Sequence, residues 1–538
     1  MPRLRVDDRE VEVPDGATVL DAARRLGIDV PALCFMEGRE PATSCMCCLV
    51  RIDGSEEFVP ACATRAAEGM RVESETPDVH DARRVSLELL LSDHLGDCLA
   101  PCQCICPAGM NIPLMIRQIA AGRVADAVVT IKEHIALPAV LGRICPAPCE
   151  KGCRRGGHDE PVSIMRLKRY PADVDLASAR PWMPECRPDS GRSVAVVGAG
   201  PTGLAAAFYL RRIGHACTLF DDHPAPGGML RYGVPASKLP RDVLDAEIGV
   251  IEALGARFRM NVRVGSDLSP DDLRRDHDAV LLAVGKLEDA STAEESPDAF
   301  FWPHVAVGPR GIEVDGRTLQ TSAPGVFAGG DAVRSRRLTV RAVADGRSAA
   351  IAIDQHLRGA EVTGAPRPFT VHIGKLRPGE MERFLVEADA RPRVDPAGGD
   401  AAGFTDAEAR AEAERCLHCD CRKPDACTLR RYAAAYGARP ARYPGDRRAF
   451  LQHREHPEII YEPGKCIACG LCIQIAAAAG ERLGLTFIRR GLDVRVVVPF
   501  GRPLSEGLET VAAECVAACP TAALAFKETP QAGPGGGR

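Results

Sequence analysis

The 538-residue chain carries 23 cysteines, most of them in short runs on either side of a single glycine fingerprint. The fingerprint, Gly198-Ala199-Gly200-Pro201-Thr202-Gly203, follows four apolar residues, Val194–Val197. Thiolates at such spacings hold iron–sulfur clusters or zinc. A glycine turn between a strand and a helix binds the pyrophosphate of a dinucleotide. A chain with both features is predicted to move electrons.

Composition narrows the class of protein. The length allows three or four domains, each with its own core. Cysteine runs without an export signal are typical of metal binding in a reducing cytoplasm. The net charge of −5 gives no reason to expect nucleic acid or an anionic membrane as a partner. No stretch reaches the ~18 apolar residues of a membrane span. We therefore expect a cytoplasmic protein.

Apolar patterning predicts the local structure. Residues 3–13 alternate around Asp7-Asp8, which indicates a hairpin. Thr18 is expected to cap a helix that ends before Gly27. Further expected elements are a helical stretch over 112–136, strands over 193–197 and 218–220, a helix from the fingerprint to about Ile213, a helix over 406–415, and a disordered tail over 528–538.

The first cysteine group lets one loop wrap a small metal cluster. Its members are Cys34, Cys45, Cys48 and Cys62. Together with the motifs Val30-Pro31-Ala32-Leu33-Cys34 and Ala61-Cys62-Ala63-Thr64, the segment resembles the [2Fe–2S] domain of the iron–sulfur subunit of respiratory NADH dehydrogenase and NAD-reducing hydrogenases. The resemblance implies a β-grasp fold with one [2Fe–2S] cluster. A structural zinc knuckle is the alternative.

The second group offers eight donors, enough for two [4Fe–4S] clusters. They are His94, Cys98, Cys102, Cys104, Cys106, Cys145, Cys149 and Cys153. The stretch Gly142–Cys153, with Pro161-Val162-Ser163-Ile164, resembles the N-terminal domain of the glutamate synthase small subunit and of dihydropyrimidine dehydrogenase. That resemblance implies one set with Cys98, Cys102 and Cys153 and another with Cys106, Cys145 and Cys149.

Each of these two sets lacks an assured fourth ligand. The first cysteine of the family's pattern is Leu95 here. His94 stands four residues before Cys98, as in the His–Cys cluster of NADH dehydrogenase, so it is a candidate ligand; a structural histidine is the alternative. Cys104 is a candidate for the other set.

A third group follows the helix expected at 406–415. Its four thiols, Cys416, Cys419, Cys421 and Cys427, lie within twelve residues. Such a run suits an iron–sulfur cluster, with zinc as the main alternative.

The last group is a broken ferredoxin run. Cys466, Cys469 and Cys472 begin the run, but Ala476 replaces its fourth cysteine. Cys519 precedes Pro520 near the end of the chain. In two-cluster ferredoxins the final Cys-Pro of one run ligates the cluster of the other. These four thiolates are therefore predicted to bind one [4Fe–4S] cluster.

The fingerprint opens a helix and leads to an acidic residue at the end of the next strand, which is the dinucleotide pattern. The stretches Gly227–Pro235 and Pro324–Asp331 resemble the glutamate synthase small subunit, which binds FAD. The residues that this resemblance assigns to FAD are Gly198, Gly200, Pro201, Gly203, Asp221, Gly228, Leu230, Gly330 and Asp331.

The expected NADPH domain is missing. In that family it lies between a strand that here ends at Gly285 and the segment that begins at Gly325. Only about forty residues separate these glycines, whereas a domain normally takes ~100. The chain contains no second glycine fingerprint. The FAD is therefore predicted to lack a hydride donor of its own.

Together these features predict a multidomain α/β and α+β chain. The expected parts are a β-grasp [2Fe–2S] domain over 1–80, a helical domain with two [4Fe–4S] clusters over 81–185, a Rossmann-like FAD domain over 190–360, a connector with the third cysteine group over 361–442, a ferredoxin-like [4Fe–4S] domain over 443–527, and the tail 528–538.

The function expected is that of an electron-transfer subunit of an NAD(P)H-linked oxidoreductase complex. Its partners would be a flavin subunit that oxidises NAD(P)H and a terminal catalytic subunit of the formate dehydrogenase or hydrogenase type. The alternative enzyme is a self-sufficient NAD(P)H oxidoreductase like the glutamate synthase small subunit. A third alternative, without catalysis, is a redox- or iron-sensing assembly protein.

Overall fold

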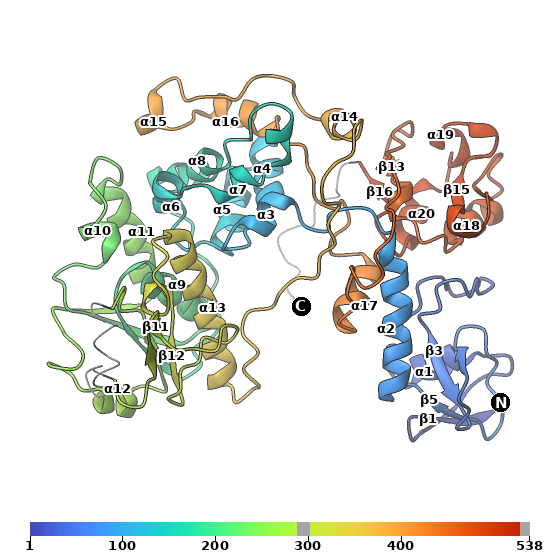
Figure 1. Cartoon of the computed structure of the whole chain (residues 1–538), viewed down its shortest axis with the longest axis horizontal. Helices are drawn as coiled ribbons and strands as arrows, with labels where there is room; N and C mark the ends of the chain where they lie inside the picture. Colours follow the sequence, from blue (N-terminus) through green and yellow to red (C-terminus); the bar gives the residue numbers. More distant parts are fainter. Residues whose placement is uncertain (288–301, 528–538) are drawn as a thin grey trace. The chain divides into compact units, whose positions relative to one another are not determined.

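The chain divides into two compact units, seen here in a computed structural model that describes residues 1–287 and 302–527 (Figure 1). The first unit contains Met1–Leu99, Pro368–Val386 and the chain from Cys419 onward. The second contains Ala100–Arg367 and Glu387–His418. In sequence, the second unit is therefore inserted into the first.

A five-stranded sheet forms the N-terminal part of the first unit, in the strand order β2-β1-β5-β3-β4. The β1–β2 hairpin turns at Asp7 and Asp8, whose φ angles of 45° and 63° are left-handed values that aspartate tolerates. Helix α1 starts at a capping box between Thr18 and Asp21. The predicted hairpin and helix are confirmed. The elements are β1 (Arg3–Val6), β2 (Arg9–Glu12), α1 (Val19–Arg25), β3 (Leu49–Ile52), β4 (Phe58–Pro60) and β5 (Arg71–Glu73).

Helix α2 (Pro77–Ser92) leads from this sheet to the loop that carries His94. Its Arg83 is fully buried, and the Nε atom donates to the Leu49 carbonyl of β3 at 2.8 Å. Arg83 Nη1 donates to the Tyr436 hydroxyl at 2.9 Å, and these two bonds offset part of the cost of burying the cation. The contact with Leu49 fixes the helix on the sheet.

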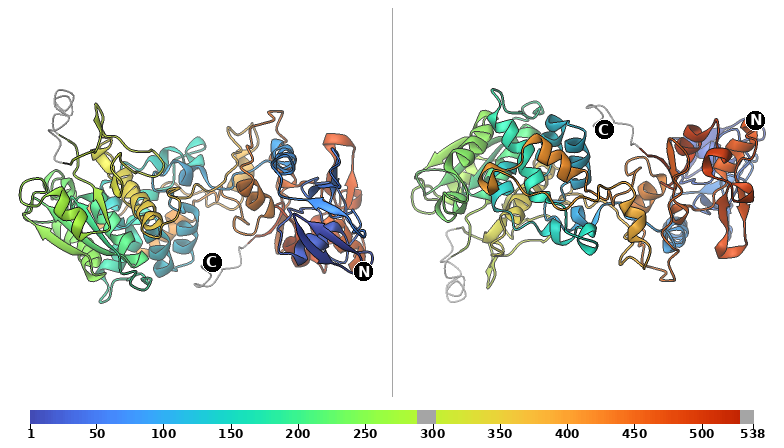
Figure 2. Two further views of the ribbon diagram at one scale, coloured as in Figure 1. Left: turned by 90° about the horizontal axis from the view of Figure 1, so that it is seen from below. Right: turned by 90° about the horizontal axis from the view of Figure 1, so that it is seen from above.

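The C-terminal part of the first unit lies beside the N-terminal part in both views of Figure 2. Arg39 donates to the Gln474 carbonyl at 3.2 Å, and the Gln474 amide donates to the Glu40 carbonyl at 3.2 Å. Strands β13 and β16 pair antiparallel, as do β14 and β15. The elements are α14 (Met381–Leu385), α17 (Thr428–Ala435), β13 (Ile459–Tyr461), α18 (Leu471–Ala479), β14 (Thr486–Ile488), β15 (Arg495–Val497), α19 (Leu504–Gly507), α20 (Ala512–Ala518) and β16 (Leu524–Phe526).

The first part of the second unit is helical. The stretch 112–136, which was expected to be helical, forms two helices, because the chain turns at Gly122, whose φ of 71° ends α4 before α5 begins. The helix expected at 406–415 is found as α16. The helices are α3 (Pro101–Ile105), α4 (Ile112–Ala120), α5 (Val124–Lys132), α6 (Pro138–Ile144), α7 (Pro148–Lys151), α8 (Ile164–Ala177), α15 (Gly399–Ala402) and α16 (Asp406–Ala413).

A parallel sheet with the strand order β12-β9-β6-β7-β8 forms the rest of the second unit. Its βαβ start confirms the strands expected at 193–197 and 218–220. Helices α9 and α13 pack against one another beside it (Figure 1). The elements are β6 (Ser193–Val197), α9 (Pro201–Ile213), β7 (Ala216–Asp221), α10 (Met229–Tyr232), α11 (Arg241–Ala253), β8 (Arg257–Met260), α12 (Pro270–Asp276), β9 (Ala279–Leu282), β10 (Val307–Gly308), β11 (Gly311–Ile312), β12 (Val326–Ala328) and α13 (Thr339–Leu357).

Two expectations concern parts of the chain outside the described residues. The tail 528–538 lies wholly outside them, and the segment between Gly285 and Gly325 lies partly outside. Residues 302–325, which are described, contain the short hairpin of β10 and β11 as their only strands. In the described part of the chain, no helix combines the length and apolar character needed to cross a membrane.

Candidate functional site

The first cysteine group lies at the N-terminal sheet, in the loop between α1 and β3 and just after β4. All four of its members are buried: Cys34, Cys45, Cys48 and Cys62. The sulfurs of Cys34 and Cys45 lie 3.3 Å apart. A hydrogen bond from Cys62 lowers the pKa of Cys48 to about 7, and the same bond raises the pKa of Cys62. Four convergent sulfur donors of this kind suit a metal cluster.

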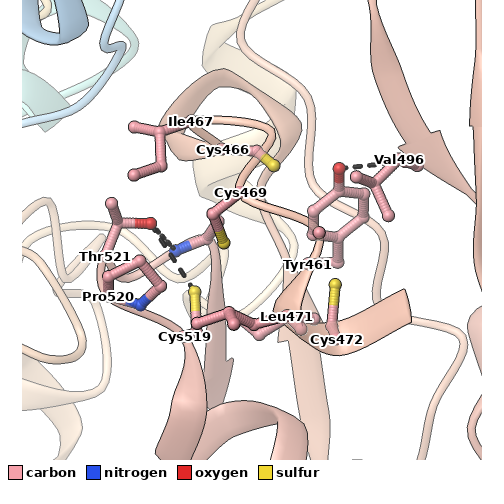
Figure 3. Close-up of a pocket in the computed structure, with 13 residues that line it drawn as sticks. Tyr461, Cys466, Ile467, Cys469, Leu471, Cys472, Val496, Cys519, Pro520 and Thr521 are labelled. Carbon is pink, nitrogen blue, oxygen red and sulfur yellow. Dashed lines mark hydrogen bonds between the residues drawn. The ribbon is translucent and has the colours of Figure 1, made fainter. Parts of the chain in front are cut away.

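The sulfurs of the broken ferredoxin run face one pocket, shown in Figure 3. Cys466, Cys469 and Cys472 come from the loop before α18 and its first turn, and Cys519 follows α20. Gly470 has a φ of 78°, which allows the loop to turn directly into α18. Tyr461 closes the pocket, its hydroxyl donating to the Val496 carbonyl at 2.9 Å. Burial raises the pKa of the first three thiols.

A third group of donors joins two segments that are far apart in sequence. Cys98, Cys421 and Cys427 are buried within the first unit. Burial raises the pKa of Cys427 to about 12, with further contributions from Cys421 and Cys98. Burial likewise raises the pKa of Cys98, and the charge of Cys421 adds to this effect.

His94 accompanies this third group. Its Nδ1 atom is buried without a hydrogen-bond partner. Burial and the charge of Lys465 lower the pKa of the imidazole to about 4. A neutral imidazole has a free lone pair and is a good metal ligand. The orphaned nitrogen therefore fits the role of a metal ligand.

The loop that carries His94 and Cys98 packs closely on the turn before Cys466. The Leu95 amide donates to the Gly464 carbonyl at 2.8 Å. A Cβ on Gly96 would lie 2.7 Å from Lys465 Cε, so glycine lets the lysine stem cross the loop. Lys465 pairs with Glu462, and both side chains are buried.

The remaining cysteines of the metal groups belong mainly to the second unit. Cys145 and Cys149 are buried in its core, and the same core is packed on by Cys102, Cys106, Cys153 and Cys416. Burial raises the pKa of Cys149 to about 12, and Cys106 and Cys145 add to the effect. Cys104 is exposed on α3. Cys419 is the residue at which the chain enters the first unit for the last time.

The glycine fingerprint adopts the tight turn that a pyrophosphate needs. Gly198 has a φ of 107°, and a Cβ on it would lie 2.4 Å from the Ala283 carbonyl oxygen. A Cβ on Gly203 would lie 2.0 Å from the Gly198 carbonyl oxygen. Gly200 and Pro201 start α9, whose free N–H groups face the turn.

The other residues assigned to FAD surround this turn. Asp221 ends β7 and accepts from the Ala199 amide at 2.7 Å. A Cβ on Gly228 would lie 2.8 Å from Gly200 Cα, and Leu230 is buried behind it. Gly330, with a φ of 72°, presents its backbone to Thr202, so a Cβ there would lie 2.2 Å from Thr202 Oγ1. Asp331 follows it and accepts from the Arg336 amide at 3.0 Å.

The donor chemistry fits the groups that the sequence implies. Buried thiols whose pKa values are raised cannot all ionise without a compensating cation, and bound iron supplies it. The glycine cradle fits a dinucleotide, because side chains there would fill the space of the pyrophosphate. When bound, FAD supplies hydride and electron chemistry and the clusters supply single-electron transfer.

Sequence reasoning missed the neighbours of Cys98. The resemblance to glutamate synthase groups it with Cys102 and Cys153, which belong to the second unit. Within its own unit its thiol neighbours are Cys421 and Cys427. The available signal was the spacing His94-x-x-x-Cys98 combined with the later C-x-x-x-x-x-C of Cys421 and Cys427.

Three families of known domains match the chain. Residues 2–77 match the 2Fe-2S iron-sulfur cluster binding domain. Residues 95–180 match the 4Fe-4S cluster domain II of dihydropyrimidine dehydrogenase, and residues 166–346 match the pyridine nucleotide-disulphide oxidoreductase domain. The chain is therefore a mixed α/β iron–sulfur flavoprotein and an FAD-dependent oxidoreductase, as the sequence predicts.

Curated relatives share these parts to different extents. The NADPH-Fe(3+) oxidoreductase subunit beta of Geobacter sulfurreducens is 40% identical over 35% of this chain and 28% of its own length. The glutamate synthase [NADPH] small chain of Mycobacterium tuberculosis is 40% identical over 35% of this chain and 39% of its own length. The NADP(+)-dependent formate dehydrogenase subunit beta of Moorella thermoacetica is 30% identical over 60% of this chain and 70% of its own length.

Several relatives are named as subunits of dehydrogenases or oxidoreductases. The similarity to the Moorella protein extends over 60% of this chain, whereas that to the Geobacter and Mycobacterium proteins extends over 35%. The chain belongs to the family of the NADP(+)-dependent formate dehydrogenase subunit beta.

Proposed function

We propose that this chain relays electrons between FAD and five iron–sulfur clusters, as the electron-transfer subunit of an NAD(P)H-linked oxidoreductase complex of the cytoplasm. One observation carries the proposal. Nineteen of the 23 cysteines, together with His94, supply twenty donors, the number that five clusters of four ligands require. So many donors favour a relay over a single structural metal.

Three of the sets belong to the first unit. The [2Fe–2S] set and the ferredoxin-like [4Fe–4S] set are those expected from sequence. The third set combines His94 and Cys98 with Cys421 and Cys427. Two observations support it: His94 Nδ1 has no hydrogen-bond partner among the described residues, and the charges of Cys98 and Cys421 contribute to the raised pKa of Cys427. The proposed sets are Cys34, Cys45, Cys48 and Cys62; Cys466, Cys469, Cys472 and Cys519; and His94, Cys98, Cys421 and Cys427.

Eight cysteines then remain for two further [4Fe–4S] clusters. Cys106, Cys145 and Cys149 influence one another, which supports one of these sets. Cys416 packs on the same core as Cys102 and Cys153, which supports a role beside them rather than in a zinc site with Cys427. The eight are Cys102, Cys104, Cys106, Cys145, Cys149, Cys153, Cys416 and Cys419.

The three proposed clusters of the first unit would follow one another in order. Burial, Cys519 and, further down the order of influence, Cys34 raise the pKa of Cys469. Cys519 also contributes to the raised pKa of Cys427. The ferredoxin-like set would then lie between the [2Fe–2S] set and the His94 set, and one apolar core cluster contains cysteines of all three, which supports their proximity.

FAD would lie at the start of α9, with Gly198, Gly200, Pro201 and Gly203 against its pyrophosphate and Asp221 near its ribose. Gly228, Leu230, Gly330 and Asp331 would line the rest of its path. The proposal that the chain has no NADPH domain rests on the short span between Gly285 and Gly325 and on the single glycine fingerprint of the sequence.

The proposed partners follow from that absence. A flavin subunit that oxidises NAD(P)H would deliver the electrons, and a terminal subunit of the formate dehydrogenase or hydrogenase type would exchange them. The name of the Moorella relative supports the formate dehydrogenase type. The domain boundaries proposed with this function are 1–80 (β-grasp), 81–185 (helical, with two [4Fe–4S] clusters), 190–360 (FAD), 361–442 (connector) and 443–527 (ferredoxin-like).

Anaerobic mixing of the reconstituted chain with NADH or NADPH tests the proposal. We expect no bleaching of the flavin absorbance until a diaphorase is added, and about 18 iron atoms per chain. Prompt bleaching by either nucleotide alone would overturn the partner requirement.

That second outcome would instead support a self-sufficient NAD(P)H oxidoreductase. The matched pyridine nucleotide-disulphide oxidoreductase domain and the names of the Geobacter and Mycobacterium relatives favour this alternative. The two functions differ in whether one chain or two chains carry the hydride step.

A further inference from the structure

The turn before Cys466 carries a buried ion pair that no metal set uses. Lys465 is 5% exposed and Glu462 is 3% exposed. The Lys465 ammonium donates to Glu462 Oε2, and the other carboxylate oxygen accepts from Gln452 Nε2 at 2.9 Å. Burial of two charges costs free energy that their mutual attraction only partly returns. Stability alone therefore does not explain why this pair is buried.

The position of Lys465 indicates a functional role. Lys465 projects across the loop between His94 and Cys98, since its Cε would meet a Cβ on Gly96 at 2.7 Å. The backbone of that loop is fixed to the same turn by the bond from Leu95 to Gly464. The loop is held from its other side by a bond from the Ile373 amide to Asp97 at 3.0 Å. The lysine is thus packed on the donors' own loop.

The carboxylate partner does not cancel the lysine at this site. The charge of Lys465 acts on His94 and on Cys421 more strongly than the opposite charge of Glu462 does. At Cys98, Lys465 is among the groups that favour the thiolate, together with Arg430. The effect of Lys465 therefore exceeds that of Glu462 at His94 and at Cys421.

We propose that Lys465 is a positioning charge that raises the reduction potential of the cluster held by His94, Cys98, Cys421 and Cys427. This inference rests on the proposed function, because it requires a cluster on that set. A cluster becomes more negative by one charge when it gains an electron, so a fixed cation nearby favours the reduced form. In a partly dehydrated site a unit charge at cluster distance changes the equilibrium constant of reduction by about tenfold.

The ferredoxin-like set would feel this charge less. Lys465 is bonded directly to Cys466 along the chain, but its side chain lies against Gly96 and is not among the residues that line the pocket shown in Figure 3. Lys465 is also not among the main causes of the raised pKa values of Cys466, Cys469 and Cys472. The lysine would therefore separate the potentials of two neighbouring clusters.

An EPR-monitored potentiometric titration of the full chain with dithionite tests this inference. The signal that disappears in Cys427→Ser identifies the cluster of the His94 set. Lys465→Met should lower the midpoint potential of this cluster by about 59 mV, which corresponds to a tenfold change in the equilibrium constant of a one-electron reduction. Lys465→Arg should retain the wild-type potential. Glu462→Gln should shift the midpoint in the opposite direction to Lys465→Met, which provides a second variant should the first fold poorly.

Two controls separate this charge from general effects. The ferredoxin-like signal should move by less than the His94-set signal in Lys465→Met. Arg482→Gln removes a cation whose side chain is 68% exposed, and water should screen it completely. Equal shifts of both clusters, or no shift in Lys465→Met with all signals present, would overturn the inference alone. Retention of every signal in Cys427→Ser would overturn the proposed cluster as well.

Discussion

The packing of α13 on α9 makes a glycine-to-alanine pair a sharp test of the flavin-binding part. Gly346 lies buried in α13, where a Cβ would come within 2.3 Å of the Thr202 carbonyl oxygen and 2.9 Å of the Ala206 amide nitrogen of α9. Both atoms are backbone in a regular helix and cannot yield alone. Gly249 lies in α11 and is exposed, and among the described residues a Cβ on it would meet no atom within 4 Å beyond its chain neighbours and the backbone of its own helix.

The two substitutions should have opposite signs. Alanine at either position gains about 0.8 kcal/mol of helix propensity. At Gly346 this gain is offset by overpacking of about 3 kcal/mol, because the two helices must separate. We therefore expect Gly346→Ala to lower the free energy of unfolding by about 2 kcal/mol and Gly249→Ala to raise it by about 0.5 kcal/mol.

Thermal release of the flavin, followed by its fluorescence in the presence of excess FAD, measures the effect. At about 2 °C per kcal/mol for a unit of this size, Gly346→Ala should melt about 4 °C lower and Gly249→Ala about 1 °C higher. Gly346→Ala should also retain less FAD on gel filtration, because Thr202 and Ala206 belong to the first turns of the helix whose N-terminus faces the pyrophosphate. Equal melting temperatures for the two variants would refute the packing argument.

Three further predictions concern single residues. Cys98→Ser should remove the same EPR signal as Cys427→Ser; loss of different signals would contradict a shared cluster. Asp221→Asn should weaken FAD retention about tenfold in equilibrium dialysis while leaving iron content unchanged. Burial raises the pKa of Glu247 from 4.5 to about 7, so the folded state favours the protonated acid, and this contribution to stability is full below pH 4.5 and lost as the pH rises through about 7. From pH 5 to pH 8 the free energy of unfolding should therefore fall by about 2 kcal/mol relative to Glu247→Gln, and parallel pH profiles for the two proteins would contradict it.

Local signals in the sequence were sufficient wherever the interacting residues are close in the chain. Thr18 and Asp21 make a capping box within one turn, so the start of α1 could be predicted. The fingerprint glycines could be assigned because each avoids a clash with backbone that the βαβ turn itself supplies. The stretch over 112–136 was less clear, because a glycine such as Gly122 is compatible with a helix interior until its φ is known.

Sequence patterns were not sufficient where the interacting residues are far apart in the chain. Cys98 and Cys421 are more than 300 residues apart, so the spacing of His94 and Cys98 would have to be combined with that of Cys421 and Cys427 across the whole insertion. The resemblance to glutamate synthase instead grouped Cys98 with thiols that follow it more closely in the chain. No local pattern marks Lys465 and Glu462 as buried, for the same reason. Their burial depends on the loop around Gly96, which reaches them from another part of the chain.

The place of the insertion follows from the same contacts. The chain leaves the first unit one residue after Cys98, at Leu99, and finally returns at Cys419, two residues before Cys421. The entropy of closing a loop grows only with the logarithm of its length, about 0.6 kcal/mol per doubling, so a long insertion is inexpensive where both of its ends are already held. His94 and the bond from Leu95 to Gly464 hold one end, and Cys427 in the core beside α17 holds the other. A cluster on these donors would join the two ends directly, and its loss should loosen the first unit at the points where the flavin-bearing unit enters and leaves.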